Sequence, residues 1–417
     1  MLHPKLINPE SIVVIGGSDR IDHLGGSVLK NLIDQKYKGK LLVVNPKKDR
    51  VQGIPSYRDV ENIPKVDLAI IAIAANEIPK VVHTLAQEKG TKGFIIYASG
   101  FGELNAEGAR LEKKICKMID EVGGSLLGPN NIGLFNKNYA GIFTRPLPKL
   151  NSKGVDFISG SGATAAFTVE VAHQIGLTFS GLYTVGNSAQ IGIEEILEYL
   201  DHSYEDGKSS RVKMLYIEGI KNPDKFLSHC LSLRHKGCEI LAVKAGVSEE
   251  GTKAAASHTG AMASSDLFID ALFKKAGIIR CFSRFELINT AGILLVTPLK
   301  IRKFAIITHA GGPAVLLTDA LCNNGLNVPE FSKIQQDDLS ELLFPGAAVK
   351  NPVDMLATGN ADQLEKVITY CEKNISQAEA IIVIFGSPGL GSVKEAYDVI
   401  SRKSKTSGKP IFAILPS

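Results

Sequence analysis

Residues 12–32, IVVIGGSDRIDHLGGSVLKNL, decide the fold of the first part of the chain. Four apolar residues predict a buried strand, Gly16, Gly17 and Ser18 follow it, and a helix is expected to begin near Gly25. Small residues at such a junction let backbone N–H groups approach an anion at the helix N-terminus. The stretch is not a good GxGxxG fingerprint, and a plain strand–helix turn would use the same glycines, so both interpretations stay open.

The same alternation of strands and helices continues on both sides of this stretch. Short runs of Val, Ile and Leu separated by stretches of helical period are typical of parallel sheets covered by helices. In the first region the sequence predicts strands at 11–15, 41–45, 68–73 and 93–98, and helices at 77–89 and 108–122. We therefore predict an α/β fold that starts with a Rossmann-like, doubly wound domain over residues 1–136.

Two further β/α series predict two flavodoxin-like, doubly wound domains with parallel sheets. Pro, Asn and Gly without periodicity predict a linker at 137–152. The second domain, 153–298, is expected to have strands at 155–158, 181–185, 214–217 and 240–244, and the third, 299–417, at 304–308, 380–385 and 410–415. Only two residues follow the last predicted strand, so we expect the third domain to be truncated at its C-terminus.

Composition excludes several classes of protein. The chain has 417 residues, of which 44% are hydrophobic and 22% charged, with a formal charge of +4, so disorder, a coiled coil and a dense basic face for nucleic acid are poor interpretations. Its six cysteines form no CxxC, which argues against a zinc site or a disulfide framework and favours a reducing cytoplasm. No apolar run approaches the ~20 residues needed to cross a bilayer, and the N-terminus does not resemble a signal peptide.

A phosphate site is predicted where the first strand of the second domain meets its helix. Residues 157–163 read FISGSGA, and the small residues lie directly before a helical pattern. This geometry would aim backbone N–H groups and two hydroxyls at a phosphate. The candidates are Ser159, Gly160, Ser161, Gly162 and Ala163. The pattern differs from the GxSxG nucleophile elbow, which disfavours a serine hydrolase.

Other strand ends of the first domain supply candidates for a cofactor crevice. A dinucleotide-binding unit has an acidic residue after its second strand, but here the sequence has Asn45, Pro46 and Lys47. A lysine there suits a phosphate better than a ribose diol, although it also suits a solvated loop. Small residues at Ala74 and Ser99 end two more strands, where ligands of open α/β sheets collect. The missing acidic residue therefore argues against an NAD-dependent oxidoreductase.

His258 and Glu218 are the candidate catalytic pair. His258 stands among small residues in KAAASHTGAMASSD, and Glu218 ends a strand in MLYIEGI. A nucleophilic imidazole needs an acceptor that orients its other nitrogen, and both residues follow strands of one predicted sheet. The alternatives are a solvent-exposed histidine in a polar loop and a surface or helix-capping carboxylate.

Taken together and in order, IVVIGGS, GPNNIGLFN, FISGSGA, YIEGI, KAG-x4-G and SHTGA resemble the nucleoside-diphosphate-forming acyl-CoA synthetases of the succinyl-CoA synthetase superfamily. The resemblance covers almost the whole chain and continues through HAGGPAVLLTDAL and NPVD, residues 309–321 and 351–354. It implies a CoA-binding domain, a phosphohistidine domain and a further flavodoxin-like domain. The implied reaction is reversible: phosphate converts acyl-CoA to acyl phosphate, which phosphorylates a histidine, which phosphorylates ADP or GDP.

The resemblance also implies residue roles and partners. His258 matches the phosphorylated histidine, Glu218 the carboxylate that activates it, and Ser159 to Ala163 the phosphate site. The positions near those at which relatives contact CoA are Gly16, Gly17, Ser18, Lys47, Ala74 and Ser99. We expect no metal ligands in this chain, because Mg²⁺ would arrive with the nucleotide on an ATP-grasp module, either a beta subunit or a fused C-terminal part. A small carboxylic acid and a homo- or hetero-oligomer are further expectations.

Several residues depart from the pattern of the family. Gly160 replaces a usual glutamine, Asn131 a frequent cysteine and His309 a frequent asparagine, while Gln190 belongs to a loop that is more acidic in relatives. Substrate handling is therefore expected to differ. The alternative function is a CoA-responsive regulatory or scaffold module without synthetase activity, and retention of His258 with Glu218 favours the enzyme.

Overall fold

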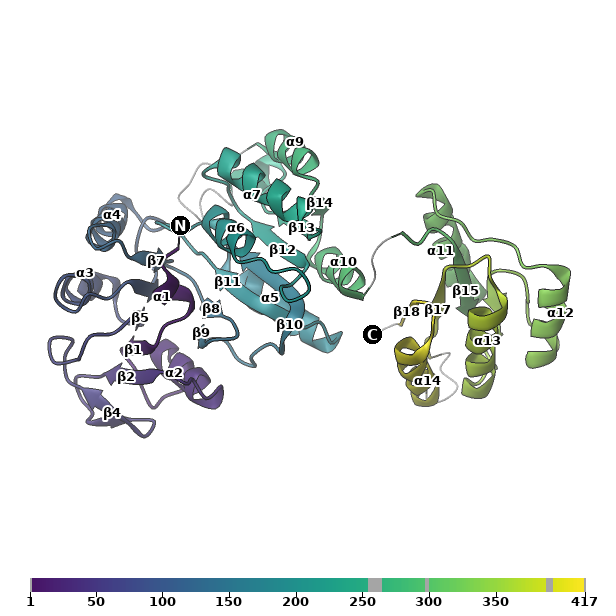
Figure 1. The fold of residues 1–417 in the computed structure, drawn as a ribbon, viewed down its shortest axis with the longest axis horizontal. Helices are drawn as coiled ribbons and strands as arrows, with labels where there is room; N and C mark the ends of the chain where they lie inside the picture. The colour runs from purple at the N-terminus through teal and green to yellow at the C-terminus, as the bar shows by residue number, and fades with distance from the viewer. Residues whose placement is uncertain (1, 254–264, 297–299, 388–392, 416–417) are drawn as a thin grey trace. The chain divides into compact units, whose positions relative to one another are not determined.

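The computed structural model describes residues 2–253, 265–296, 300–387 and 393–415. The chain forms two compact units, Met1–Val296 and Thr297–Ser417, each considered by itself below (Figure 1). Among the described residues, no helix combines the length and apolar character needed to span a membrane.

The first sheet has the strand order β3-β4-β2-β1-β5-β6-β7. Apart from β3, which is antiparallel to β4, its neighbouring strands are parallel, and β4 to β7 follow the 3-2-1-4-5-6 order of a Rossmann fold. The strands are β1 Ser11–Ile15, β2 Lys40–Val44, β3 Arg50–Val51, β4 Ile54–Tyr57, β5 Leu68–Ile71, β6 Gly93–Ile96 and β7 Ser125–Leu127. The four predicted strands and the Rossmann-like fold are confirmed.

Helices cover both faces of this sheet because its central strands are apolar on both sides. Helices α1 (Pro4–Ile7) and α2 (Leu24–Asp34) share one core cluster with alternate strand residues, and α3 (Ile78–His83) and α4 (Ala106–Asp120) share the other. The predicted helix 77–89 is a succession of a 3₁₀ turn, α3 and a π-helical turn. Gly25 lets α2 approach β1, since a Cβ there would lie 2.1 Å from the Gly16 carbonyl oxygen.

The second sheet has the strand order β14-β13-β12-β10-β11-β8-β9. Its parallel strands, taken from β11 to β14, follow the flavodoxin-like order 2-1-3-4-5. The strands are β8 Gly133–Phe135, β9 Ala140–Ile142, β10 Leu150–Ser159, β11 Phe179–Thr184, β12 Val212–Ile217, β13 Glu239–Lys244 and β14 Ile279–Cys281. The helices are α5 Gly162–Gln174, α6 Ile193–His202, α7 Pro223–His235, α9 Asp266–Ala276 and α10 Arg284–Val296.

The segment predicted as a linker, 137–152, instead contains β9 and the first residues of β10. The hairpin β8–β9 extends the second sheet antiparallel to β11. It also packs on α2 of the first sheet, because Asn31 Nδ2 donates to the Ile142 carbonyl at 2.6 Å and Ser27 Oγ to that of Phe143 at 2.5 Å. One apolar cluster runs from the first sheet into the helices of the second, which joins both sheets in one unit. The domain limits 1–136, 153–298 and 299–417 remain predictions.

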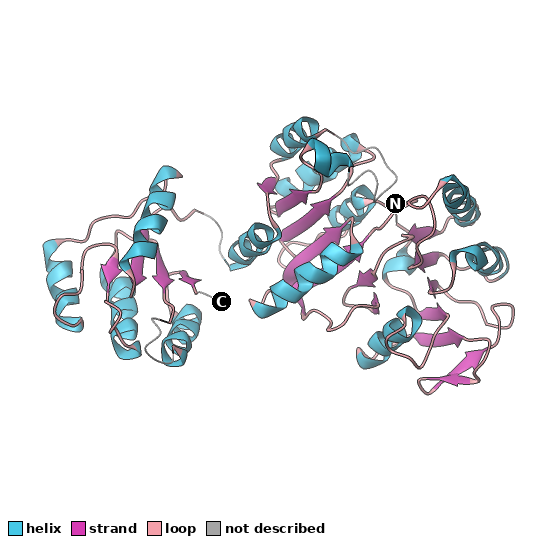
Figure 2. Cartoon of the chain, turned by 180° about the vertical axis from the view of Figure 1, so that it is seen from behind, coloured by secondary structure: helices cyan, strands magenta, loops and turns pink. Residues whose placement is uncertain are grey.

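The second unit is a smaller parallel sheet of order β16-β15-β17-β18. Its strands are β15 Phe304–Thr308, β16 Val353–Asp354, β17 Ala380–Ile384 and β18 Ile411–Ile414. Helix α11 (Gly311–Asn323) packs on one face, and α12 (Lys333–Leu342), α13 (Ala361–Asn374) and α14 (Lys394–Thr406) share a core with the other (Figure 2). The three strands predicted for this part of the chain are present as β15, β17 and β18.

Candidate functional site

The junction between β10 and α5 forms the structured part of the predicted phosphate site. Ser161 is the N-cap of α5, and its hydroxyl accepts a hydrogen bond from the Thr164 N–H at 3.3 Å. Ser159, fully buried, donates from Oγ to the Ser161 carbonyl at 2.7 Å and accepts from the Ser161 N–H at 3.2 Å. Both hydroxyls therefore serve the local backbone, whereas the sequence suggested that they face the phosphate.

Backbone N–H groups remain as the anion donors of this junction. The Gly160 N–H is committed to the Tyr216 carbonyl at 2.9 Å. The N–H groups of Gly162 and Ala163 belong to the first turn of α5, where the helix offers no intrahelical acceptor. These donors, together with the positive end of the helix dipole, favour a bound anion.

A cavity of about 200 Å³ brings this junction together with Glu218. Its lining comes from both sheets of the first unit: Tyr97, Asn130, Asn131, Ile132, Phe143, Gly160, Ser161, Gly162, Ala163, Gly186, Asn187 and Glu218. A Cβ placed on Gly160 would lie 3.4 Å from Glu218 Cγ, so the absence of a side chain at residue 160 keeps the space beside Glu218 open. The structure thus unites two of the predicted groups.

Charged and polar groups surround Glu218, which directly follows β12. Burial raises the pKa of Tyr216, and the charge of Glu218 raises it further. Burial lowers the pKa of Lys244, at the end of neighbouring β13, while the charges of Asp266 and Glu218 oppose this shift. Glu218 therefore adds negative charge to a partly desolvated end of the sheet. His258, its predicted partner, lies outside the described residues.

The predicted CoA residues follow four adjacent strands of the first sheet. In the order β2-β1-β5-β6 these strands end in register, with Ile15 opposite Val44 and Ile71, and Ile71 opposite Ile96. The residues after them therefore share one edge: Lys47, the group Gly16, Gly17 and Ser18, Ala74 and Ser99. Lys47, Ala74 and Ser99 are exposed there.

The loop after β1 is held in a fixed shape. Gly16 has φ +81°, and a Cβ there would lie 2.5 Å from the Ala72 carbonyl oxygen, so the turn requires glycine. Asn45 binds the Gly17 carbonyl through Nδ2 at 2.8 Å and accepts the Lys47 N–H at 2.9 Å. Asn45, weighed in the sequence only as a replacement for an acidic residue, thus joins two of the predicted loops.

Sequence reasoning missed the residues that reach the cavity from distant parts of the chain. Tyr97 and Phe143 form an edge-to-face pair with centroids 5.0 Å apart, and the Tyr97 hydroxyl donates to the Gly141 carbonyl at 3.1 Å. Asn187 lines the same cavity from the loop after β11. The motif GPNNIGLFN marked only one of these loops, because the contacts that bring them together are long-range.

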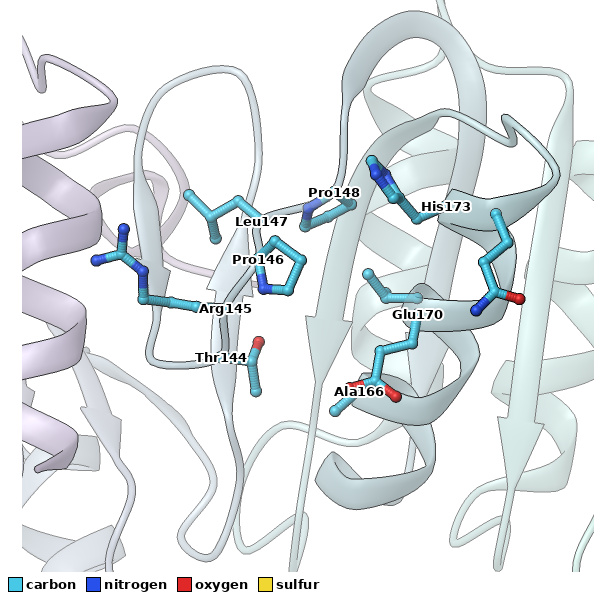
Figure 3. A pocket seen from close by; sticks show the side chains of 10 residues that line it. Thr144, Arg145, Pro146, Leu147, Pro148, Ala166, Glu170 and His173 are labelled. Carbon is cyan, nitrogen blue, oxygen red and sulfur yellow. The ribbon is translucent and has the colours of Figure 1, made fainter. Parts of the chain in front are cut away.

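Another pocket, of about 230 Å³, lies between the segment 144–148 and the outer side of α5 (Figure 3). Its lining includes Glu170 and His173 from α5 and Arg145, which pairs with Asp34 at 3.0 Å. It contains none of the predicted site residues.

One group of side chains in the described parts of the chain has the composition of a metal site: Asp201, His202 and His229. Asp201 already accepts hydrogen bonds from His229 Nδ1 at 2.8 Å, and from Ser232 Oγ and Lys236 Nζ, both at 2.7 Å. The Lys236 ammonium group compensates the carboxylate charge, so the cluster is a hydrogen-bonded ion-pair network.

Family models match both sheets of the first unit. Residues 10–135 match a CoA binding domain, and residues 152–294 match a succinyl-CoA ligase like flavodoxin domain. Both matches agree with the strand orders described above.

Relatives extend the similarity over the whole chain. The chain is 34% identical to the ADP-forming acetate–CoA ligase II subunit alpha of Pyrococcus furiosus, over 98% of this chain and 88% of the relative. It is 31% identical to the ADP-forming acetate–CoA ligase I of Archaeoglobus fulgidus, over 96% of this chain but only 57% of that longer protein.

A solved structure is also similar over nearly the whole chain. The dinucleotide-forming acetyl-coenzyme A synthetase 1 of Candidatus Korarchaeum cryptofilum, in complex with phosphate and ADP, superposes with a TM-score of 0.84 at 26% identity. The match covers 99% of this chain and 88% of that one. Since the strand orders, the domain models and the full-length relatives agree, this chain belongs to the family of ADP-forming acid–CoA ligases and is of its alpha type.

Proposed function

We propose that the chain carries out the CoA- and histidine-dependent steps of acid–CoA ligation. Phosphate attacks the acyl-CoA carbonyl, the C–S bond breaks, and acyl phosphate and CoA form. The acyl phosphate then passes its phosphoryl group to His258 and leaves as the free carboxylate, and phosphohistidine finally phosphorylates ADP. The observation that carries the proposal is the cavity in which the first turn of α5 and Glu218 lie together.

The roles proposed for the side chains follow from this geometry. The N–H groups of Gly162 and Ala163 would bind phosphoryl oxygens and stabilise the charge that develops on them during transfer. Glu218 would accept a hydrogen bond from the imidazole of His258, fix its tautomer and stabilise the imidazolium. The residues after β1, β2, β5 and β6 would hold CoA at the edge of the first sheet.

The nucleotide step requires a partner surface. The Pyrococcus relative is named as an alpha subunit, and the Korarchaeum structure holds phosphate and ADP. We infer that ADP binds on an ATP-grasp module, supplied by a beta subunit or a fused domain, and that Mg²⁺ accompanies the nucleotide. Acetate is the acid named for several relatives and is the first candidate for this chain. The six free cysteines support work in a reducing compartment.

The test uses a half-reaction that needs no nucleotide module. The purified chain is incubated with radiolabelled acetyl phosphate or propionyl phosphate, and acid-labile, base-stable label is counted. We expect label on the wild type, none on His258→Ala, and a rate at least about 100-fold lower for Glu218→Gln, the range typical of lost general-base assistance. Glu249→Gln, at an exposed carboxylate of the same unit, is the matched control and should label normally.

Absence of label on a folded wild type that binds CoA would contradict the proposal that the chain is an enzyme. It would support the CoA-responsive regulatory or scaffold module. Equal labelling of the wild type and Glu218→Gln would be consistent with phosphohistidine formation but would contradict the role proposed for Glu218.

A further inference from the structure

Asn187 forms a hydrogen-bonded bridge between the two sheets of the first unit. It lies in the loop after β11 of the second sheet and lines the cavity with Glu218. Its single amide nitrogen donates to two carboxylates of the first sheet's side, to Glu103 Oε2 at 2.5 Å and to Glu112 Oε2 at 2.9 Å. One amide group with two N–H bonds therefore satisfies two acidic side chains.

The same two carboxylates hold the loop that follows β6. Glu103 Oε1 accepts the N–H groups of Gly100 at 2.5 Å and Phe101 at 3.2 Å. Glu112 Oε2 accepts the N–H of Gly102 at 3.4 Å. Ser99, one of the residues proposed for CoA, directly precedes these N–H groups, so its position depends on carboxylates that Asn187 anchors.

Asn187 itself has little freedom to move. Its N–H donates to the Pro129 carbonyl at 3.0 Å, its Oδ1 accepts from Asn130 Nδ2 at 3.2 Å, and its carbonyl accepts from Lys221 Nζ at 3.3 Å. The preceding Gly186 is pressed against the same turn, where a Cβ would lie 2.2 Å from the Pro129 carbonyl oxygen. A displacement of the loop 99–102 would thus be resisted by the wall of the cavity.

Charge explains why an amide suits residue 187. Burial acts to raise the pKa of Glu103, but hydrogen bonds from Asn187 and from backbone N–H groups outweigh it and hold the pKa below its usual value. Glu103 is therefore a carboxylate at neutral pH, beside a second acidic residue. An aspartate at 187 would lose both donated hydrogen bonds and place a third negative charge between the two.

We propose that Asn187 is a positioning residue that fixes the CoA-side loop 99–102 against the phosphate cavity through Glu103 and Glu112. The inference rests on the proposed function, since it takes the edge of the first sheet to be the CoA site. It predicts that the bridge governs CoA affinity, beyond its contribution to folding.

The test measures CoA binding to the full chain by isothermal titration calorimetry. We expect Asn187→Asp to weaken CoA binding at least tenfold. In the double variant Asn187→Asp with Glu103→Gln, the amide and the carboxylate exchange places, one donated hydrogen bond is restored in the reverse direction, and most of the affinity should return. Circular dichroism of each variant shows whether it is folded, so the loss and return of CoA affinity are compared between folded proteins only.

Gln190→Ala supplies the matched control within the same loop. Gln190 also bridges to the first sheet's side, with Nε2 2.5 Å from Asp120 Oδ1 and Oε1 accepting the Leu126 N–H at 2.5 Å, but its hydrogen bonds to described residues do not reach the loop 99–102. We expect its CoA affinity to stay within twofold of the wild type.

Two results would overturn the inference: a folded Asn187→Asp protein with wild-type CoA affinity, or an equal loss in Gln190→Ala. If the wild-type chain binds no CoA, the proposed function fails first and the inference with it. The wild-type titration therefore separates the two failures.

Discussion

Lys213 Nζ lies 2.5 Å from Asp156 Oδ2 in the interior of the second sheet, where the two residues face each other across neighbouring β12 and β10. The side chains are 1% and 5% exposed, and Lys213 Nζ also donates to the Ser210 carbonyl at 2.8 Å. Burying two charges costs desolvation energy, which their mutual attraction and the extra hydrogen bond offset only while both partners are present.

Removing one partner should therefore be costly. We expect Lys213→Met to lower the free energy of unfolding by about 3–5 kcal/mol, because it leaves a buried carboxylate without a cation. Urea titration followed by circular dichroism measures the change. Lys208→Met, which breaks the exposed pair with Glu205, should leave the free energy of unfolding close to that of the wild type. A loss below about 1 kcal/mol for Lys213→Met would show that Asp156 finds another partner.

The sequence predicted the strands around this pair but not the pair itself. Buried parallel strands appear as continuous apolar runs, so β1, β5, β12 and β17 could be located from local pattern. From the sequence alone, Lys213 is interpreted as a polar residue at the end of an apolar run. Only the register of β10 against β12 places it beside Asp156. The hairpin β8–β9 was missed for a similar reason, since its three-residue strands carry too few side chains to show a period.

The helix cap at Ser161 should contribute to both stability and phosphate binding. Ser161→Ala removes the hydroxyl that caps α5 and is expected to cost about 1 kcal/mol of unfolding free energy. Fraying of the first turn would also disorder the N–H groups of Gly162 and Ala163, so labelling by acyl phosphate should fall several-fold. Asn222→Ala removes an equivalent cap from α7 and should cost similar stability without affecting labelling. Equal labelling in both variants would mean that the cap is structural only.

The candidate site was predictable to the extent that it is local. The local sequence pattern at residues 159–163 predicts a strand end, a tight turn and a helix N-terminus within a few residues, and the structure has that junction. The other wall of the cavity comes from Tyr97, Asn130 and Asn187, which are brought in by pairing of distant strands and by packing of one sheet against another. No local period or turn signal encodes such contacts.

The open space at Gly160 should control the size of the group that enters the cavity. Gly160 has no positive φ, and a Cβ at 3.4 Å from Glu218 Cγ is a tolerable contact, so Gly160→Ala should fold normally. Gly160→Gln must direct a longer side chain into the cavity or over Glu218. We expect its labelling rate to fall more with branched-chain acyl phosphates than with acetyl phosphate. An unchanged ratio of the two rates would show that residue 160 does not limit the size of the acyl group.

The network around Asp201 predicts a pH-dependent contribution to stability. Burial acts to raise the pKa of this carboxyl, but hydrogen bonds from His229, Lys236 and Ser232 outweigh it and leave the pKa below its value in the unfolded chain. The folded state therefore binds its proton less readily than the unfolded state. The stabilisation is complete above the unfolded-state pKa of about 3.9 and is lost as the pH falls through the folded-state value.

We expect Asp201→Asn to lower the unfolding free energy by about 1–3 kcal/mol at pH 7, since buried hydrogen bonds to a charged group are lost. The difference from the wild type should begin to shrink as the pH falls below about 4 and be smallest below the folded-state pKa, where both proteins carry a neutral group at this residue. A difference for Asp201→Asn that stays constant down to pH 2 would assign the effect to packing instead of charge.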